Sequence, residues 1–403
     1  MNDAQFVELA AWITDAGLAG HSETATLEGI CDRAVTLGLP LARVTALIDT
    51  LHPIYEGRAF IWKRDKNETA ISEYDRSSQN LRRWVGSPFY YLEKNDESLL
   101  RRRLTAETEK EFPVFPELRA EGMTDYVAMV NRFAADGIVG NMDCVYSSWT
   151  TDAPAGFRDA DVADIGRLMP LLALTLKATS LARIAGTLVE TYLGRDAGRR
   201  VLEGRISRGV AEQIEAAIWF SDLRGYTRLS DTAKPEEIIP LLNEYADAII
   251  SAIHEHGGDV LKLMGDGVLA IFTAADRSRA CEAALTAAED APRRVAEVNG
   301  RRSADGLPTT ELYLGLHIGE VFYGNIGSKE RLDFTIVGPA VNEVSRIASM
   351  CRSVDQPLLV SSAFATALGA SRSRLVSVGR YALRGVSRPQ DLFTLANDAD
   401  ERR

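Results

Sequence analysis

Hydrophobic residues in the first part of the chain follow a helical period, then a strand period, then a helical period again. Residues 2–50 carry apolar positions at helical spacing, which predicts two helices. From Val44 to Lys63 the sequence is rich in β-branched and aromatic residues and begins to alternate, which predicts strands. Further strands are expected at 100–105, 125–132 and 140–149, and helical spacing returns at 157–181.

Residues 183–214 are charged, and their apolar positions are spaced to line one face of a helix. Such a connector helix is either a solvated spacer between domains or a signalling helix that pairs with its copy in a dimer. The order of elements before it, over residues 1–182, resembles a GAF-type sensor domain. That resemblance implies a regulatory domain for an unidentified small-molecule or protein signal. Its aromatic residues are more typical of a core than of a ligand pocket: Trp62, Trp84, Tyr90, Tyr91 and Trp149.

The chain from residue 215 onward alternates strand-like and helix-like segments. A buried strand is expected to end at Asp222, a long amphipathic helix to cover 236–256, and a hairpin to turn at 265–267. Later elements are expected as a helix at 276–299, strands at 311–319, 320–327 and 333–338, a helix at 340–350, and strands near 358 and 392. This pattern predicts a mixed sheet.

Composition narrows the class of protein. The 403 residues, enough for two or three domains, include 57 acidic and 46 basic side chains and give a net charge of −11, which disfavours a nucleic-acid partner. The apolar stretch 168–176 contains Pro170 and is far shorter than the ~20 residues of a membrane span. The N-terminus lacks the basic region of a signal peptide, so we expect a cytoplasmic protein. The four cysteines form no CxxC pair and are expected to be reduced and buried.

Two carboxylates stand where such residues often carry chemistry. Asp222 lies at the end of a strand, and Asp266 lies at the tip of a hairpin. Paired carboxylates in such places can hold hard cations such as Mg²⁺, which prefer oxygen ligands and bridge to phosphates. Each aspartate taken alone is also typical of an ordinary turn residue before glycine.

Four segments together are more specific than either aspartate. They are FSDLRGYT at 220–227, LKLMGDGVLAIF at 261–272, LGLHIGEVFYGNIGSKERLDFTIVGPAVNEVSRI at 314–347 and LRGVSRPQDLFTL at 383–395. In this order and spacing they resemble the class III nucleotidyl cyclases. The resemblance implies an α+β chain in which residues 215–397 form a ferredoxin-like βαββαβ catalytic domain and the N-terminal region is a GAF-like α/β domain. It also implies cyclisation of a nucleoside triphosphate.

The resemblance assigns metal and phosphate roles. It makes Asp222 and Asp266 the ligands of two Mg²⁺ (or Mn²⁺) ions in each active site. The backbone segment expected to wrap the triphosphate includes Leu223, Gly225, Tyr226 and Thr227. The residues that bind pyrophosphate stay open between Arg331 and Lys329 in one segment and Arg384 and Arg388 in another, because each is equally explained as a surface charge.

It also assigns the residues that read the base and stabilise the transition state. Lys262 matches the purine-reading position, and its ammonium suits adenine N1, an acceptor, rather than guanine N1, which carries a proton. Thr335 stands where many adenylyl cyclases have an aspartate that accepts from the 6-amino group; a bacterial subgroup has threonine, and Asp333 is an open alternative. Asn342 matches the residue that orients the ribose, and Arg346 the one that stabilises charge on the reacting phosphoryl group.

In this family the active site forms between two catalytic domains. Because one chain carries both sets of residues, the resemblance implies a homodimer with two equivalent sites and ATP as substrate. The main prediction is therefore an adenylate cyclase regulated by its N-terminal domain. Two alternatives stay open: a guanylate cyclase, and a regulatory module of cyclase fold without turnover. His317 and the pair His254 and His256 are expected to be structural or surface residues.

Overall fold

The computed structural model describes residues 1–403 except 67–68, 135–138, 385, 387–388 and 397–403. The chain divides into two compact units, Met1–Leu188 and Val189–Arg403, each with its own core. We describe each unit by itself.

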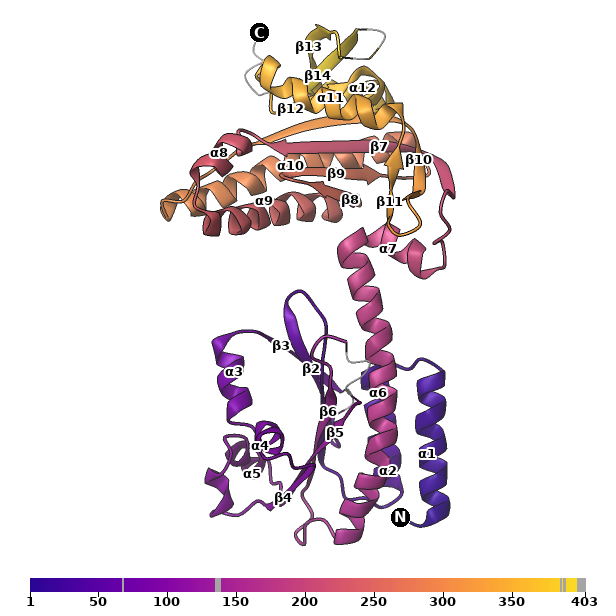
Figure 1. The fold of residues 1–403 in the computed structure, drawn as a ribbon, viewed down its shortest axis with the longest axis vertical. Coiled ribbons are helices and arrows are strands. Elements are labelled where there is room, and N and C mark those ends of the chain that lie inside the picture. The colour runs from indigo at the N-terminus through magenta and orange to yellow at the C-terminus, as the bar shows by residue number, and fades with distance from the viewer. Residues whose placement is uncertain (67–68, 135–138, 385, 387–388, 397–403) are drawn as a thin grey trace. The chain divides into compact units, whose positions relative to one another are not determined.

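The N-terminal unit is a six-stranded antiparallel sheet with helices on both faces (Figure 1). Its strands, in the order β3-β2-β1-β6-β5-β4, are β1 (Arg43–Asp49), β2 (Tyr55–Lys63), β3 (Ala70–Asp75), β4 (Leu99–Arg103), β5 (Asp125–Arg132) and β6 (Cys144–Thr151). Its helices are α1 (Asp3–Leu18), α2 (Glu23–Thr36), α3 (Ser78–Val85), α4 (Pro88–Lys94), the short 3₁₀ turn η1 (Thr108–Lys110), α5 (Phe115–Ala120) and α6 (Asp159–Leu193). The two entry helices, the antiparallel sheet and the closing helix are confirmed; β3 and α3 to α5 were not predicted.

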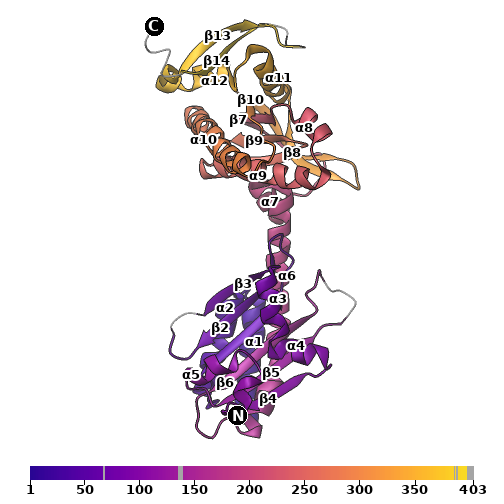
Figure 2. The same ribbon diagram turned by 90° about the vertical axis from the view of Figure 1, so that its left-hand side faces the viewer.

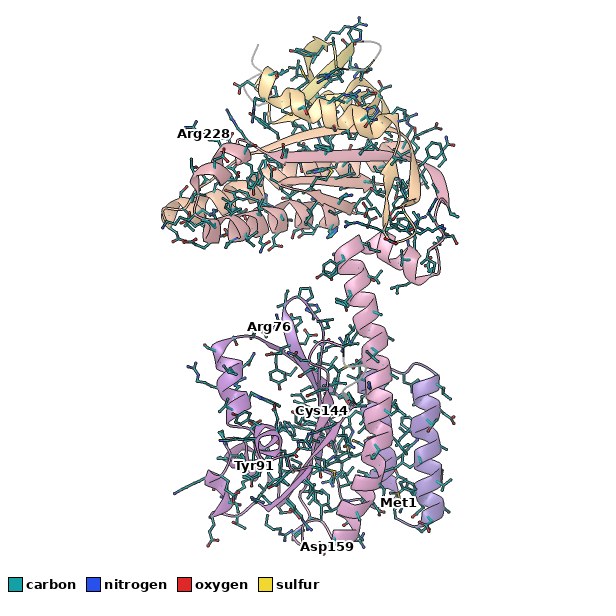
Figure 3. The ribbon with its side chains drawn as sticks, viewed as in Figure 1. Met1, Arg76, Tyr91, Cys144, Asp159 and Arg228 are labelled. Carbon is teal, nitrogen blue, oxygen red and sulfur yellow. The ribbon has the colours of Figure 1, made fainter. Side chains whose placement is uncertain are left out.

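The aromatic residues of this unit are divided between the two faces of the sheet. Trp62 and Trp149 are buried in the core that α1, α2 and α6 form on one face, whereas Trp84 and Tyr91 pack against the core beneath α3 to α5 on the other. They belong to two hydrophobic cores rather than to one pocket. Cys144, on β6, is buried like the other three cysteines, all of which are free thiols as predicted (Figure 3).

Helix α6 differs from the prediction in two ways. It is a single helix of 35 residues that continues through Pro170 and ends at Leu193, so the closing helix and the start of the connector are one element. The connector is not helical as far as residue 214: Gly194, at φ +88°, interrupts the helix, α7 (Arg195–Leu202) follows, and residues 203–210 are neither helix nor strand. A β-carbon at Gly194 would lie 2.3 Å from the carbonyl oxygen of Val260, so only glycine fits at this bend.

Helix α6 also bears on the membrane prediction. Among the described residues it is the single helix long and apolar enough to cross a bilayer, with 44% of its most apolar window buried inside the structure. A core helix of a globular domain has the same composition, and α6 contributes Ile165, Leu168 and Leu172 to the N-terminal core.

The C-terminal unit contains a ferredoxin-like βαββαβ arrangement, which confirms the predicted fold. Its strands are β7 (Ala211–Leu223), β8 (Asp259–Met264), β9 (Gly267–Phe272), β10 (Leu312–Gly327), β11 (Leu332–Val337), β12 (Leu358–Ser361), β13 (Leu375–Tyr381) and β14 (Gln390–Leu395). Its helices are α7, α8 (Tyr226–Thr232), α9 (Pro235–Glu255), α10 (Arg277–Ala304), α11 (Pro339–Val354), α12 (Ser362–Ala367) and the 3₁₀ turn η2 (Gly369–Arg374). The central strands follow the order β10-β7-β9-β8, and the parallel pair β10–β12 makes the sheet mixed.

Strand β7 shows how the sheet divides this unit into two cores. Ala217 and Trp219 face the core formed with α9 and α10, which lie next to each other on one face of the sheet (Figures 1 and 2). Ala216 and Ile218 face the opposite side, where α7 and α11 complete a second core. Strand β7 begins at Ala211 rather than 215, and the two strands expected at 311–327 are one continuous strand, β10.

Candidate active site

Two carboxylates from different elements meet at one end of the C-terminal sheet. Asp222 is near the end of β7, and Asp266 is in the tight turn between β8 and β9. The backbone N–H of Leu223 lies 3.1 Å from Asp222 Oδ1 and 3.1 Å from Asp266 Oδ2, so it donates to both carboxylates. Gly267, just after Asp266, fits this turn because a β-carbon there would lie 2.9 Å from the Ser221 carbonyl oxygen.

Burial and the neighbouring carboxylate change the acid–base behaviour of Asp222. Partial burial, together with the neighbouring Asp266, raises the pKa of Asp222 to about 7, while the Leu223 N–H and the charge of Arg352 partly offset this. Of these two causes, the neighbouring carboxylate is the one that a bound cation would offset. The carboxylates of Asp222 and Asp266 therefore lie close together, with the Leu223 N–H as their shared hydrogen-bond donor.

This donor set fits a hard divalent cation. Carboxylate oxygens are preferred ligands of Mg²⁺, and a cation between Asp222 and Asp266 would relieve their repulsion. Within the described ranges no group of three or more His, Cys, Asp or Glu side chains is placed to hold a metal. Two carboxylates leave most coordination positions to water or phosphate, which is the usual way in which Mg²⁺ is bound in nucleotide sites.

The segment expected to contact the triphosphate follows directly. Leu223 is buried, and Gly225 adopts a left-handed conformation at φ +73° immediately before α8. Tyr226 and Thr227 are the first two residues of that helix, and Tyr226 packs against the core of α9 and α10. Glycine at position 225 permits the sharp change of direction that starts α8 beside the two carboxylates.

A second charged pair brings β8 and β11 together. The ammonium of Lys262 lies 2.7 Å from Asp333 Oδ2, and both side chains are partly exposed. Thr335 is on the same face of β11 as Asp333, because Phe334 and Ile336 between and beyond them are buried in the core on the other side. The structure therefore places the expected purine-reading lysine against Asp333, and Thr335 two residues further along.

Helix α11 carries the remaining two expected residues. Asn342 is exposed and Arg346 is half-buried. Glu343, between them in sequence, lies 3.8 Å from Nδ1 of the buried His317, and burial raises the pKa of Glu343 while the Arg346 charge lowers it. His317 also hydrogen-bonds to the Ser361 hydroxyl at 2.8 Å, and burial lowers its pKa to about 4. His317 is thus a buried, hydrogen-bonded residue, in line with the structural role expected for it, and its proximity to Glu343 of α11 was not predicted.

The basic residues expected near pyrophosphate differ in position. Arg331 is exposed in the turn between β10 and β11, where its charge helps to lower the pKa of Asp333. Lys329 is exposed in the same turn, and Arg384 is exposed after β13. Arg388 lies outside the described residues. The geometry of these residues does not choose among them.

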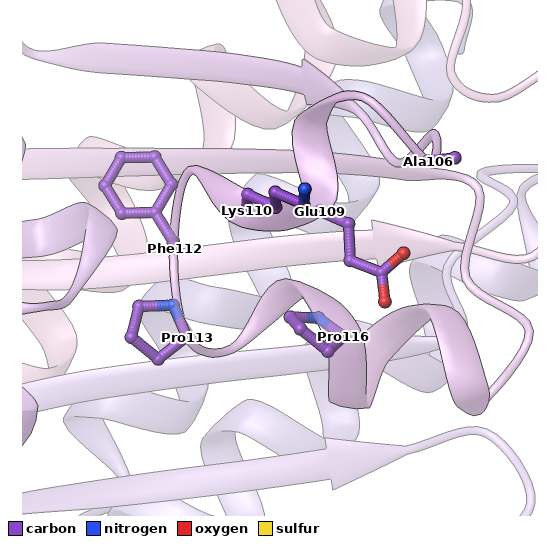
Figure 4. Close-up of a pocket in the computed structure, with 6 residues that line it drawn as sticks. All are labelled: Ala106, Glu109, Lys110, Phe112, Pro113 and Pro116. Carbon is purple, nitrogen blue, oxygen red and sulfur yellow. The ribbon is translucent and has the colours of Figure 1, made fainter.

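The expected residues do not all meet within one chain. Asp222 is paired with Tyr313 near the start of β10, whereas Thr335 is paired with Gly324 near its end. The carboxylate pair and the Thr335 position therefore lie toward opposite ends of the same strand. A cavity of about 530 Å³ elsewhere, in the N-terminal unit, contains none of the expected residues (Figure 4); it is lined by Ala106, Glu109, Lys110, Phe112, Pro113 and Pro116.

Comparisons with known proteins identify the class of this domain. Residues 210–397 match the family of the adenylate and guanylate cyclase catalytic domain. The match covers most of the C-terminal unit, which therefore resembles a cyclase catalytic domain in sequence.

The comparisons also give individual proteins that are similar to this chain. Adenylate cyclase 1 of Rhizobium meliloti (strain 1021) is 30% identical over 222 residues, which are 53% of this chain and 33% of that protein. The chain thus spans about a third of the length of the curated relatives it matches. The crystal structure of the adenylyl cyclase CyaB from P. aeruginosa is similar at 24% identity and a TM-score of 0.43, covering 47% of this chain and 97% of that one. That of the guanylyl cyclase Cya2 is similar at 30% identity and a TM-score of 0.41, covering 46% and 94%.

Proposed function

We propose that this protein is an adenylate cyclase that converts ATP to 3′,5′-cyclic AMP and pyrophosphate. The observation that carries the proposal is the convergence of Asp222 and Asp266 on the Leu223 N–H, within a domain that matches the cyclase family. In the reaction the ribose 3′-oxygen bonds to the α-phosphorus, the bond from that phosphorus to the bridging oxygen breaks, and pyrophosphate leaves. The 3′-hydroxyl proton passes to solvent.

Asp222 and Asp266 are proposed to hold two Mg²⁺ or Mn²⁺ ions. When bound, these ions lower the pKa of the 3′-hydroxyl and neutralise phosphate charge. The backbone from Leu223 to Thr227 would then lie along the triphosphate. Pyrophosphate would be held by Arg331 or Arg384, whose exposed guanidinium groups can each bind two phosphate oxygens.

Residues of α11 are proposed to complete the chemistry. The planar guanidinium of Arg346 suits charge spread over the reacting phosphoryl oxygens, and its half-buried position strengthens such an interaction. Asn342, one turn earlier on α11, would orient the ribose. Between these two residues in sequence, Glu343 of α11 lies 3.8 Å from His317 of β10.

ATP is proposed as the substrate because of the chemistry of Lys262. An ammonium only donates hydrogen bonds, so it matches adenine N1 and opposes guanine N1–H. The hydroxyl of Thr335 can accept from the adenine 6-amino group. Lysine and threonine at these positions together favour adenine over guanine.

The active form is proposed to be a homodimer with two shared sites, regulated by its N-terminal unit in the cytoplasm. The positions of Asp222 and Thr335 toward opposite ends of β10 support a site that a second copy completes. The N-terminal unit, a helix-covered antiparallel sheet, is proposed to be a GAF-like sensor of a small-molecule or protein signal. Nucleic acid is not expected as a partner of this acidic chain.

The test is a turnover assay of the purified full chain with ATP or GTP, in Mg²⁺ and in Mn²⁺. We expect cyclic AMP from ATP, with a higher kcat/KM than for cyclic GMP from GTP. Faster production of cyclic GMP would make the protein a guanylate cyclase, and absence of both products under both metals would identify a module without turnover.

A further inference from the structure

The ion pair between Lys262 and Asp333 joins two strands that are not neighbours in the sheet. Strand β8 is at the edge of the sheet and pairs with β9, whereas β11 pairs with β10. Only the 2.7 Å contact from Lys262 Nζ to Asp333 Oδ2 links their polar side chains among the described residues. Lys262 on β8 is therefore held by Asp333, a residue of a strand that does not pair with β8.

The register of β11 decides which residue meets the lysine. Asp333 and Thr335 share one face of the strand, and their α-carbons are about 7 Å apart because the rise is about 3.3 Å per residue. The Lys262 ammonium, 2.7 Å from Asp333 Oδ2, is thus held beside Asp333 rather than beside Thr335. In the described part of the chain the Thr335 side chain makes no hydrogen bond, so its hydroxyl is available to a ligand.

We infer that Asp333 is a positioning residue for base recognition, which holds the ammonium of Lys262 in place for the adenine edge. This inference rests on the proposed function and deepens it. A partly exposed lysine samples many rotamers, and an ion pair selects the few that keep its nitrogen near Asp333. Of the three N–H donors of the ammonium, one points to Asp333 and the others stay available for adenine N1.

The same pair also acts against guanine. Guanine presents an N1–H donor, which an unengaged carboxylate would accept. Lys262 is bound to that carboxylate, and the hydrogen bond from its ammonium is the main cause that lowers the pKa of Asp333, so the acid stays ionised and paired at neutral pH. Asp333 therefore favours adenine over guanine because its carboxylate is already bound to Lys262, while Thr335 contacts the base.

The experiment measures equilibrium binding of 3′-deoxy-ATP and 3′-deoxy-GTP, which lack the attacking hydroxyl, to the full chain with Mg²⁺. Asp333→Ala is expected to weaken binding of 3′-deoxy-ATP about tenfold and to narrow the preference over 3′-deoxy-GTP, because the lysine is no longer held. Asp333→Glu should restore most of the preference. Glu330→Gln, an exposed acid in the same β10–β11 turn, is the matched control and should bind within about twofold of the unmodified protein.

The double variant separates positioning from direct contact. If Asp333 acts through Lys262, then adding Asp333→Ala to Lys262→Ala changes binding of 3′-deoxy-ATP by less than about twofold. Equal losses in both backgrounds would overturn the inference, as would an unchanged preference in Asp333→Ala. The turnover assay of the unmodified chain distinguishes the two proposals. If cyclic AMP is produced but Asp333→Ala does not change nucleotide binding, only the positioning role of Asp333 is rejected. If Asp333→Ala changes binding but no cyclic AMP is produced, only the proposed enzymatic activity is rejected. Binding of neither nucleotide rejects both.

Discussion

Two pairs of charged side chains, each with one member on the β8–β9 hairpin, differ in whether they need a ligand to balance their charge. Asp222 and Asp266 are like charges that share one backbone N–H donor. Lys262 and Asp333 are opposite charges in direct contact at 2.7 Å. The first pair gains from an added cation, whereas the second is already neutral overall.

This difference separates the parts of the candidate site by their dependence on ligand. The backbone brings the two carboxylates together, and partial burial, together with the neighbouring Asp266, raises the pKa of Asp222 to about 7. The Lys262–Asp333 pair lowers the pKa of Asp333 instead. We therefore expect the carboxylate pair to govern metal-dependent activity and the second pair to govern which nucleotide binds.

The largest expected effect comes from removing one carboxylate. Asp222→Ala or Asp266→Ala should lower kcat by at least about 10³-fold, because metal binding supplies several kcal/mol of transition-state stabilisation and each 1.36 kcal/mol is tenfold. Chelation of divalent cations should have the same effect on the unmodified chain. Asp231→Ala, an exposed aspartate on α8, is the control and should retain activity. Substantial turnover by both Asp222→Ala and Asp266→Ala would show that the carboxylate pair does not govern metal-dependent activity.

Much of the carboxylate pair could be predicted from the sequence. Asp222 was expected to end a buried strand and Asp266 to occupy a Gly-Asp-Gly turn, and the resemblance to the cyclases, rather than either position alone, predicted that they pair. The contact between Lys262 and Asp333 could not be predicted, because alternation shows which face a residue occupies but not which distant strand lies across from it.

The strands and helices were predicted best where their side chains pack in a core. Strand β5 was predicted with its observed bounds because every second residue has a clear role in a core. Strand β3 was missed because it lies at the sheet edge with an exposed, polar pattern. Helix α6 contains Pro170, as the predicted helical range 157–181 implied; this proline is exposed, whereas its neighbours Leu168 and Met169 are held in the core. At this position the packing of the helix against the core outweighs the tendency of proline to break a helix.

A mixing experiment tests whether the carboxylate pair of one chain works with α11 of another. Asp222→Ala and Arg346→Ala should each be inactive alone. After subunit exchange, random pairing makes about half of the dimers mixed, each with one intact site of two, so activity should recover to about a quarter of the unmodified value. Proven exchange without recovery would show that each chain forms its own site.

The next effect concerns stability against pH without metal. The pKa of Asp222 is raised on folding from 3.8 to about 7, so the folded state binds this proton more tightly than the unfolded state does. Its contribution to stability is therefore present below pH 4 and is lost as the pH rises through 7. Asp222→Asn should raise the unfolding temperature at pH 8, and should raise it less at pH 5, where only part of this contribution has been lost. Mg²⁺ should stabilise the unmodified chain more at pH 8 than at pH 5.

Thermal unfolding at the two pH values, with and without Mg²⁺, measures this effect. The control is again the exposed Asp231, whose replacement by Asn should shift the unfolding temperature equally at both pH values. An Asp222→Asn variant that is less stable than the unmodified chain at pH 8 would mean that the carboxylates do not repel each other in solution.

The smallest expected effect is on the stability of the second pair. Lys262 and Asp333 are 44% and 39% exposed, and exposed ion pairs contribute about 0–1 kcal/mol to folding because water and salt screen them. Asp333→Asn should therefore change the free energy of unfolding by less than about 1 kcal/mol, in the destabilising direction, and less at high salt. Chemical denaturation at low and high salt measures the change. A loss of several kcal/mol would make the pair a structural element of the β8–β11 contact, whereas a small loss combined with altered nucleotide preference assigns its charge to recognition.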